Sequence, residues 1–148
     1  MEIRKIKRNE IPDACRLSHM VYEIAIRRNR PVDEQAHKFF YEYMTEENIS
    51  SCYDSGELII WAAFDKHFMA AVCAMTKRGH ITMLYVHPHF LRRRIAKKLV
   101  TKARICAKME LGLDMVTVNA MPPETAGYFR KIGFADINQY TAPDAQFI

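Results

Sequence analysis

The chain has 148 residues, 49% hydrophobic and 26% charged, which are the length and composition of one globular domain with a substantial core. Disorder is excluded by this composition, and the sequence has neither a run of 18 apolar residues nor the apolar core of a signal peptide, so we expect a cytoplasmic protein that does not contact a membrane. The formal net charge of +5 favours an anionic partner, which a nucleotide cofactor, a nucleic acid or an acidic protein would satisfy.

A short strand and two helices open the chain. Residues 2–8 alternate apolar and basic side chains, which indicates a half-exposed strand that stops at Asn9. We expect Asn9 to cap the helix that follows, because an apolar stripe at helical spacing continues from there to about Ile26. Residues 27–31 (RRNRP) interrupt this helix, and a second helix starts near Asp33.

A third helix and three antiparallel strands occupy the middle of the chain. Thr45 is placed to cap a short helix over residues 46–53. Residues 58–64 and 68–75 are almost wholly apolar and are joined by a tight polar connection, the pattern of an antiparallel hairpin. After a further turn, residues 80–86 predict a third antiparallel strand, rich in β-branched, aromatic and other apolar side chains.

The last third of the chain predicts two helices and two strands. A basic amphipathic helix runs to about residue 111, and a strand at 115–119, a helix through residue 131 and a strand at 134–140 follow. The complete order predicts a single-domain α/β (α+β) fold, in which helices flank a mixed, mostly antiparallel twisted sheet of about six strands.

Positive charge is concentrated where the basic helix begins. Arg92, Arg93 and Arg94 precede the first apolar residue of the helical stripe, Ile95. The first N–H groups of a helix lack intrahelical partners and lie at the positive end of its dipole, so this end suits phosphate. The arginines otherwise form a solvated basic face or contact nucleic acid. Nucleic-acid binding is the weaker alternative, because most aromatic residues fall in apolar periodic patterns typical of a core and would not stack on bases.

Metal binding and disulfides are not expected. The four cysteines are widely spaced and form no C-x-x-C pair, so we interpret them as reduced thiols. His87 and His89 flank Pro88, but no third ligand lies in the same stretch.

Two motifs, together with the order of the elements, resemble the GCN5-related N-acetyltransferase (GNAT) family. Residues 84–99 (LYVHPHFLRRRIAKKL) resemble the acyl-CoA pyrophosphate loop of that family, commonly written V-x-P-x-x-[Q/R]-x-x-G-x-[G/A]. Val86, Pro88 and Ala96 fall in register with this motif, as does Ile95. Asn119 followed by residues 128–134 (YFRKIGF) resembles the late helix and Gly-Phe turn of the family. The similarity spans nearly the whole chain.

The resemblance implies acetyl-CoA as acyl donor and an unidentified amine as acceptor. In the family, the backbone of the third antiparallel strand pairs with the pantetheine arm and the loop after it holds the pyrophosphate. Asn119 is implied as a further contact, or else it satisfies the following turn. The implied cofactor-binding residues are Leu84, Tyr85, Val86, Arg92, Arg93, Arg94, Ile95, Ala96, Lys97, Asn119 and Phe129.

Two residues depart from the pyrophosphate motif. Leu91 stands where the family has Gln or Arg, and Arg94 stands at the characteristic glycine. Glycine allows close approach of backbone N–H groups to phosphate. We therefore expect Arg94 either to adopt an ordinary helical φ with its amide available or to close the site in part. Its side chain can also contact phosphate directly.

The acid and base of the reaction are less clearly marked. The family tyrosine that protonates the CoA thiolate falls on Phe129, so the resemblance leaves Tyr128, Tyr85, solvent or no dedicated acid for this step. His80 falls where related enzymes carry the glutamate that deprotonates the acceptor, and a histidine is competent for this near neutral pH. His80 is otherwise a solvated turn residue. The predicted catalytic residues are His80 and Tyr128.

The sequence therefore predicts an N-acetyltransferase that transfers acetyl from acetyl-CoA to a primary amine in a ternary complex. The alternatives are a non-catalytic acyl-CoA-binding or protein-interaction module of the same fold and a nucleic-acid-binding protein that uses the basic helix. By analogy, Tyr22, Ile26 and residues 27–30 form the rim of the acceptor pocket, and their arginines hint at an acceptor with a carboxylate or phosphate. A homodimeric assembly is left open.

Overall fold

The computed structural model of the chain describes residues 1–29, 34–119 and 126–135. In these residues, one five-stranded sheet has the order β1-β2-β3-β4-β5. The first four strands are antiparallel and the fifth is parallel to the fourth. Their bounds are β1 (Glu2–Lys5), β2 (Leu58–Asp65), β3 (Phe68–Thr76), β4 (His80–Val86) and β5 (Thr117–Val118).

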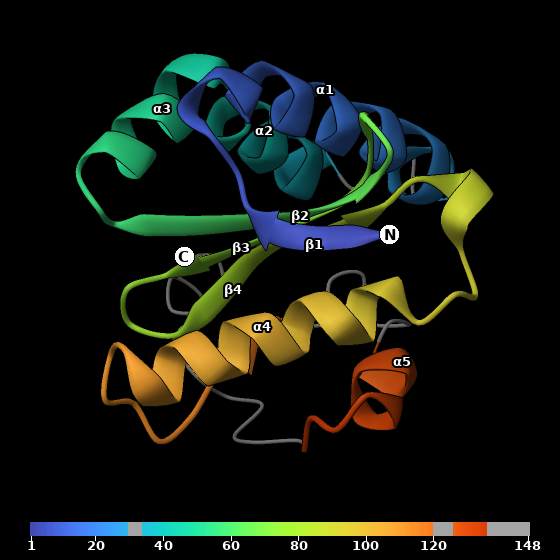
Figure 1. The fold of residues 1–148 in the computed structure, drawn as a ribbon. Helices are drawn as coiled ribbons and strands as arrows, with labels where there is room; N and C mark the ends of the chain where they lie inside the picture. The colour runs from blue at the N-terminus through green and yellow to red at the C-terminus, as the bar shows by residue number, and fades with distance from the viewer. Residues whose placement is uncertain (30–33, 120–125, 136–148) are drawn as a thin grey trace.

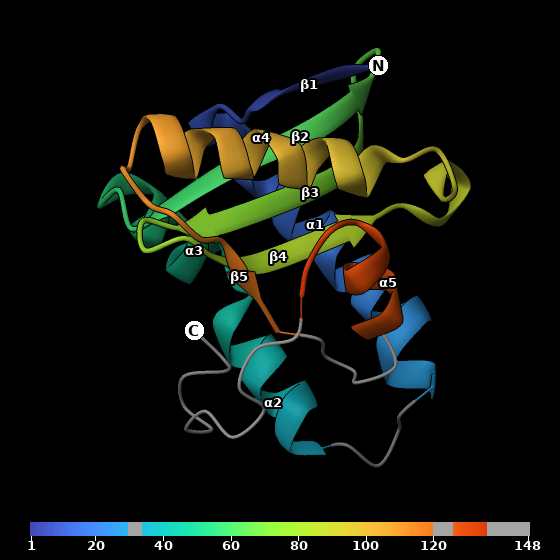
Figure 2. The ribbon, with the colours of Figure 1, turned by 90° about the horizontal axis from the view of Figure 1, so that it is seen from below.

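Helices cover both faces of the sheet (Figure 1). Three of them lie on one face, whereas the long basic helix lies on the other and crosses the sheet beneath β2 and β3 (Figure 2). The late helix lies beside the first turns of the basic helix in both views. Their bounds are α1 (Ile11–Val21), α2 (Glu34–Tyr43), α3 (Glu46–Asp54), α4 (Ile95–Met109) and α5 (Ala126–Lys131).

Two core layers explain why β2 and β3 are apolar on both faces. Ile60 and Val72 belong to the layer between the sheet and α1–α3, whereas Trp61 and Cys73 belong to the layer between the sheet and α4. Successive side chains of a strand point to opposite faces, so a strand covered on both sides is apolar throughout. The apolar runs predicted as strands are therefore the central strands of the sheet.

The predicted order of elements is confirmed, with two differences at the first helix. Thr45 caps α3 as predicted, since its hydroxyl accepts a hydrogen bond of 3.1 Å from the Asn48 N–H. Asn9 does not cap α1; it lies in a 3-10 turn, η1 (Arg8–Glu10), and α1 begins at Ile11. The stripe that continues to Ile26 is α-helical only to Val21, after which a π-helical turn, η2 (Tyr22–Ile26), follows.

Part of the C-terminal prediction lies outside the described residues. The strand expected at 134–140 lies mostly there, as does the proline-rich start of the late helix. The strand expected at 115–119 is present as the shorter β5. The described residues thus contain five of the roughly six strands expected.

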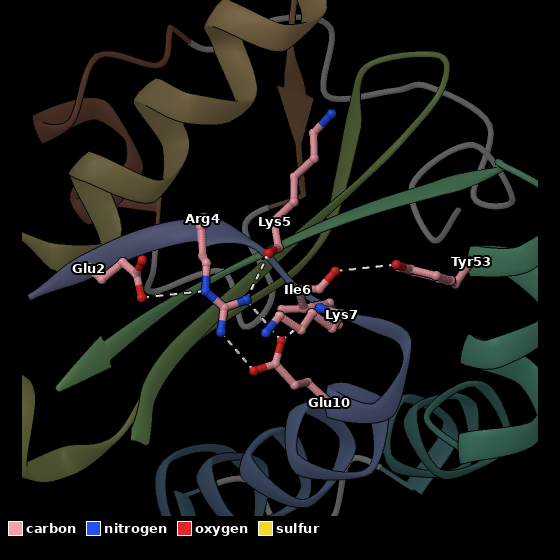
Figure 3. A network of polar contacts seen from close by, with 7 residues as sticks. All are labelled: Glu2, Arg4, Lys5, Ile6, Lys7, Glu10 and Tyr53. Atoms are coloured by element: carbon pink, nitrogen blue, oxygen red, sulfur yellow. Dashed lines mark hydrogen bonds and ion pairs between the residues drawn. The ribbon is translucent and has the colours of Figure 1, made fainter. Parts of the chain in front are cut away.

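A polar network fixes the bend between β1 and α1 (Figure 3). The carboxylate of Glu10 accepts two hydrogen bonds from the Arg4 guanidinium, at 2.9 and 2.8 Å, and a third of 2.6 Å from the Lys7 N–H. From α3, the Tyr53 hydroxyl donates a hydrogen bond of 3.2 Å to the carbonyl of Ile6. The guanidinium of Arg4 also lies 4.2 Å from the centre of the Phe64 ring. The edge strand is thereby held to the helical layer.

Glu10→Gln is expected to lower the Tm by roughly 2–4 °C at pH 7. The hydrogen bonds from Arg4 hold the pKa of Glu10 below its ordinary value of 4.5, so the stabilisation is present above that pH and is lost as the pH falls through the lower pKa of the folded state. Thermal unfolding from pH 7 to pH 3 checks this. Glu2→Gln is the control, because its exposed carboxylate lies 3.4 Å from the same guanidinium. Equal losses in both variants at pH 7 would contradict the role of Glu10.

Candidate active site

The strands β4 and β5 separate after two residue pairs. His80 pairs with Thr117 and Ile81 pairs with Val118, and no later residue of β4 is paired with β5 in the described chain. The register between β3 and β4 shifts between Ala74 and Met75, which leaves Thr82 without a partner residue on β3. Such a bulge increases the local twist of a strand and can end its pairing on one side. From Thr82 onward, β4 presents an edge that β5 does not cover.

The direction of the peptide groups along β4 follows from one hydrogen bond. The His87 N–H donates to the carbonyl of Ala70 at 2.8 Å, so the peptide groups of residue 87 face β3. Because these directions alternate along a strand, those of Tyr85 also face β3, whereas the N–H and C=O groups of Leu84 and Val86 face the uncovered edge. This edge can pair with an extended ligand in the manner of a further strand.

The loop after β4 contains two arginines in the left-handed region of backbone conformation. The φ angles are +64° for Arg92 and +59° for Arg94, and Arg94 directly precedes α4. The positive φ of Arg94 is not the ordinary helical φ that was one of the two expectations, whereas partial closure of the site stays a prediction. Arg94 adopts the conformation that glycine takes most readily, at the position where the resembling motif has glycine. The backbone path of the loop is therefore retained without the glycine.

The first amides of α4 are left for an anion. The earliest hydrogen bond of the helix runs from the Lys98 N–H to the carbonyl of Arg94 at 3.1 Å. The preceding N–H groups, those of residues 95–97, have no acceptor within the helix. Ile95 and Ala96 are buried, with 3% and 6% of their surface exposed, and this fixes the position of the first turn. The arrangement suits phosphate because free N–H groups and the positive end of the dipole coincide.

One cavity of about 1050 Å³ joins the uncovered edge of β4 to the start of α4. Every residue that the sequence predicted as catalytic or cofactor-binding lines it, except Arg93, whose guanidinium lies 5.1 Å from the centre of the Phe90 ring. The site residues among the lining are His80, Leu84, Tyr85, Val86, Arg92, Arg94, Ile95, Ala96, Lys97, Asn119, Tyr128 and Phe129.

His80 lies at the closed end of the cavity, where β4 and β5 are still paired. Its Nδ1 lies 2.7 Å from Oγ1 of Thr117, and the side chain is half-buried. Burial lowers the pKa of His80 below its ordinary value of 6.5, so the imidazole is neutral at pH 7. When Nδ1–H donates to Thr117, Nε2 carries the lone pair and can accept a proton. A solvated turn residue does not describe this position.

Tyr128 and Phe129 are brought to the cavity by α5. Phe129 packs against Phe134, with ring centres 5.8 Å apart, and the Arg104 guanidinium lies 4.7 Å from the centre of the Phe134 ring. Gly133 has a φ of +109°, and a Cβ there would lie 3.2 Å from this guanidinium, so the turn requires glycine. Tyr128 is 44% exposed, and burial raises its pKa above 10.0. The late helix is thus held against α4 with Tyr128 beside the cavity.

The other end of the cavity is formed by helices on the opposite face of the sheet. Tyr22 and Ile26 line it as predicted, whereas Arg27, Arg28 and Asn29 do not. The guanidinium of Arg27 donates to the Tyr41 hydroxyl at 2.8 Å, so it is engaged with the outer side of α2. Arg27, Arg28 and Asn29 therefore do not form the predicted rim, and Arg30 lies outside the described residues. An anionic acceptor stays a prediction.

Sequence reasoning missed the contribution of α2 to this cavity. Phe39, Phe40 and Tyr43 were interpreted as core residues from their helical spacing, and all three line the cavity. Phe40 is buried, but Phe39 is 43% exposed. Periodicity identifies the apolar face of a helix and does not say whether protein or ligand covers it.

The described residues contain neither a metal cluster nor a membrane-spanning helix. No group of three or more His, Cys, Asp or Glu side chains there could hold a metal ion. All four thiols are free, three of them buried. Within residues 1–29, 34–119 and 126–135, no helix is both long and apolar enough to cross a membrane.

Residues 28–144 match the family model described as an acetyltransferase (GNAT) domain. The chain belongs to the GNAT acetyltransferase family. The predicted family and the predicted enzyme class, an N-acetyltransferase, are confirmed by this match. No curated protein sequence matches the chain significantly.

Solved structures share the fold of this GNAT protein at low sequence identity. The PaiA N-acetyltransferase of Thermoplasma acidophilum, solved with coenzyme A, is 15% identical over 93% of this chain and 92% of its own, with a TM-score of 0.76. An acetyltransferase of Clostridium acetobutylicum, solved with acetyl-CoA, is 18% identical over 95% and 94%, with a TM-score of 0.66. The aminoglycoside antibiotic 6'-N-acetyltransferase of Acinetobacter haemolyticus is 15% identical over 96% of both chains, with a TM-score of 0.72.

Replacing Arg94 in this GNAT loop by Gly and by Ala separates the backbone effect from that of the side chain. Both variants lose the guanidinium, but only Ala retains a Cβ in the left-handed conformation. We expect the unfolding free energy of the Gly variant to exceed that of the Ala variant by about 1 kcal/mol in denaturant titrations. The same exchange at Lys98, inside the first turn of α4, is the control and should favour Ala by roughly 1 kcal/mol. Equal stability of the two Arg94 variants would show that Arg94 has no positive φ in solution.

Proposed function

We propose that this protein transfers an acetyl group from acetyl-CoA to a primary amine, by direct attack of the amine on the thioester in a ternary complex. The observation that carries the proposal is the single cavity that joins three features: the uncovered edge of β4, the free amides at the start of α4 and the neutral His80. Acetyl-CoA is an extended thioester with a phosphate-bearing tail. Its extended arm matches the uncovered edge of β4, and its phosphates match the free amides at the start of α4.

The cofactor would lie along β4 and end at α4. Its pantetheine arm would pair with the open-edge peptide groups of Leu84 and Val86, and its pyrophosphate would accept hydrogen bonds from the N–H groups of residues 95–97. Arg92, Arg94 and Lys97 line this part of the cavity and add positive charge near the phosphates. Asn119, just beyond β5, lines the opposite wall and offers an amide to the arm.

In the proposed reaction, the amine nitrogen attacks the thioester carbon and the C–S bond breaks, which gives an amide and the free thiol of CoA. An N–H group on the uncovered edge of β4 would stabilise the oxyanion that forms in between. His80 would accept the proton that the attacking amine releases, because its imidazole is neutral and lines the cavity.

Tyr128 is the better candidate for the acid that protonates the departing thiolate. It is partly exposed and adjacent to Phe129 on the cavity wall. Tyr85 packs instead among the core residues around Phe40, with ring centres 6.1 Å apart, and burial raises its pKa well above the ordinary value. A phenol whose pKa is raised so far is a weak proton donor.

Purified protein is expected to bind acetyl-CoA in isothermal titration and to release free thiol when a primary amine is added. Lys97→Glu should raise the Kd for acetyl-CoA by roughly tenfold to a hundredfold, since one charge-assisted phosphate contact becomes a repulsion. Lys98→Glu is the matched control: the same charge change at the adjacent exposed residue, which does not line the cavity, should alter the Kd less than about threefold.

The outcomes of this experiment separate the competing functions. Absence of acetyl-CoA binding would overturn the proposal. Binding without thiol release, across a broad panel of amines, would favour the non-catalytic module that Phe129 in place of the family tyrosine suggests. Equal effects of the two lysine variants would mean that the phosphates do not lie at the start of α4.

The pH dependence of kcat tests the two proton-transfer residues. Because the pKa of His80 is lowered, kcat should fall on the acid side only below pH 6.5, as the imidazole becomes protonated and can no longer accept a proton. His80→Gln should remove this limb and lower kcat by roughly a hundredfold or more. Tyr128→Phe should leave the acid limb in place and remove the basic limb above pH 10, where the phenol ionises. An unchanged profile in either variant would reject the role of that residue.

A further inference from the structure

The end of the cavity away from the phosphate site is aromatic and apolar. η2 and α2 form it, and two stacked aromatic pairs stand there: Tyr22 on Phe40, with ring centres 3.8 Å apart, and Phe39 on Tyr43, with ring centres 6.1 Å apart and planes 4° apart. Phe39 is 43% exposed although it lines a cavity. A flat apolar wall of this kind buries ring-shaped ligands by stacking.

The two ends of the cavity differ in charge. None of the described residues that line it is an aspartate or a glutamate. Its cations belong to the loop after β4 and the start of α4, together with Lys131 at the end of α5. Glu23 and Glu42 adjoin Tyr22 and Tyr43 in sequence, but neither lines the cavity. The carboxylate of Glu42 lies 3.9 Å from the Lys38 ammonium. The carboxylate of Glu23 accepts a hydrogen bond from the Tyr41 hydroxyl and lies 3.7 Å from the Arg27 guanidinium.

These charges select against a polycationic acceptor. A ligand with several ammonium groups requires carboxylates or carbonyl clusters to replace its hydration, and burying an unpaired charge is costly. The described lining offers phenol and imidazole groups and stacked rings instead. One amine can be accommodated, since it loses its charge when it hands a proton to a base and attacks the thioester.

We propose that the acceptor is a primary amine carried on a flat apolar body, an arylalkylamine in chemical terms, and that an aminoglycoside is a poor acceptor. The inference deepens the proposed acetyl transfer and rests on it. The ring would lie against Phe39 and Tyr43, with the amine directed along the cavity toward β4 and the thioester.

The test compares three acceptors of the wild-type protein with acetyl-CoA: 2-phenylethylamine, propylamine and the aminoglycoside kanamycin. We expect kcat/KM for thiol release to be at least about tenfold higher for 2-phenylethylamine than for propylamine, because only the former buries a ring. Kanamycin should be the weakest of the three. Equal values for the two simple amines, or a preference for kanamycin, would overturn the proposal.

Variants of Phe39 test whether the aromatic end of the cavity causes the preference for 2-phenylethylamine. Phe39→Ala should lower kcat/KM for 2-phenylethylamine by roughly tenfold and that for propylamine by less than about threefold. Phe39→Glu introduces a carboxylate, which the described lining lacks, and should raise the relative rate with kanamycin. Ile105→Ala and Ile105→Glu are the controls, because Ile105 is 55% exposed on α4 and does not line the cavity. Acceptor preferences that do not change in either Phe39 variant would overturn the placement of the ring.

Binding measurements keep this inference distinct from the proposed reaction. Isothermal titration of each amine into the protein saturated with CoA, the thiol product, needs no turnover. Tighter binding of 2-phenylethylamine than of propylamine, lost in Phe39→Ala, would support the aromatic site even if no thiol is released, in which case only the proposed reaction fails. Turnover with no difference between the amines, or binding of neither amine, would reject the aromatic site.

Discussion

The early end of the pairing between β4 and β5 is the constraint on which the cavity depends. Had the two strands stayed paired, the peptide groups of Leu84 and Val86 would be used within the sheet and no cavity would open beside them. Two features set where the strands part. The bulge at Thr82 bends β4, and Gly79 holds the closed end, since its carbonyl accepts a hydrogen bond of 2.9 Å from the Thr117 N–H. A Cβ on Gly79 would lie 3.0 Å from both Leu113 and the Met115 carbonyl, so the closed end requires glycine.

The strands and most helices could be predicted because their signals are local. Residues 80–86 were predicted as a strand and form β4 with those bounds, because a turn precedes them and Pro88 follows. The cap at Thr45 was also predicted correctly, because a threonine directly before an acidic first turn is a typical N-cap. Asn9 failed as a cap because the Glu10 carboxylate accepts from the Lys7 N–H and bonds Arg4 on β1, a contact between elements that sequence spacing does not reveal.

Only the part of the candidate site that lies in recognisable sequence motifs could be predicted. The loop before α4 was predicted as an anion site from the chemistry of a helix start, and His80 was predicted from the family resemblance. The aromatic end was not predicted, because the spacing of Phe39, Phe40 and Tyr43 is the same whether the face is covered by protein or lines a cavity. The π-helical turn at Tyr22–Ile26 was also missed, although four of its five residues line that cavity. Such turns carry no composition signal and are frequent at functional sites.

The loop before α4 shows how the chain takes a left-handed path without a glycine. A left-handed non-glycine residue costs about 1–2 kcal/mol, and such strain persists where the flanking structure determines the path of the chain. On one side, the Phe90 N–H donates to the His87 carbonyl at 2.8 Å, and His87 is itself bonded to β3. On the other side, Ile95 is buried against the sheet and fixes the first turn of the helix. Arg94 lies between two fixed points and takes the conformation they leave, so the chain enters the first turn of α4 through a left-handed residue.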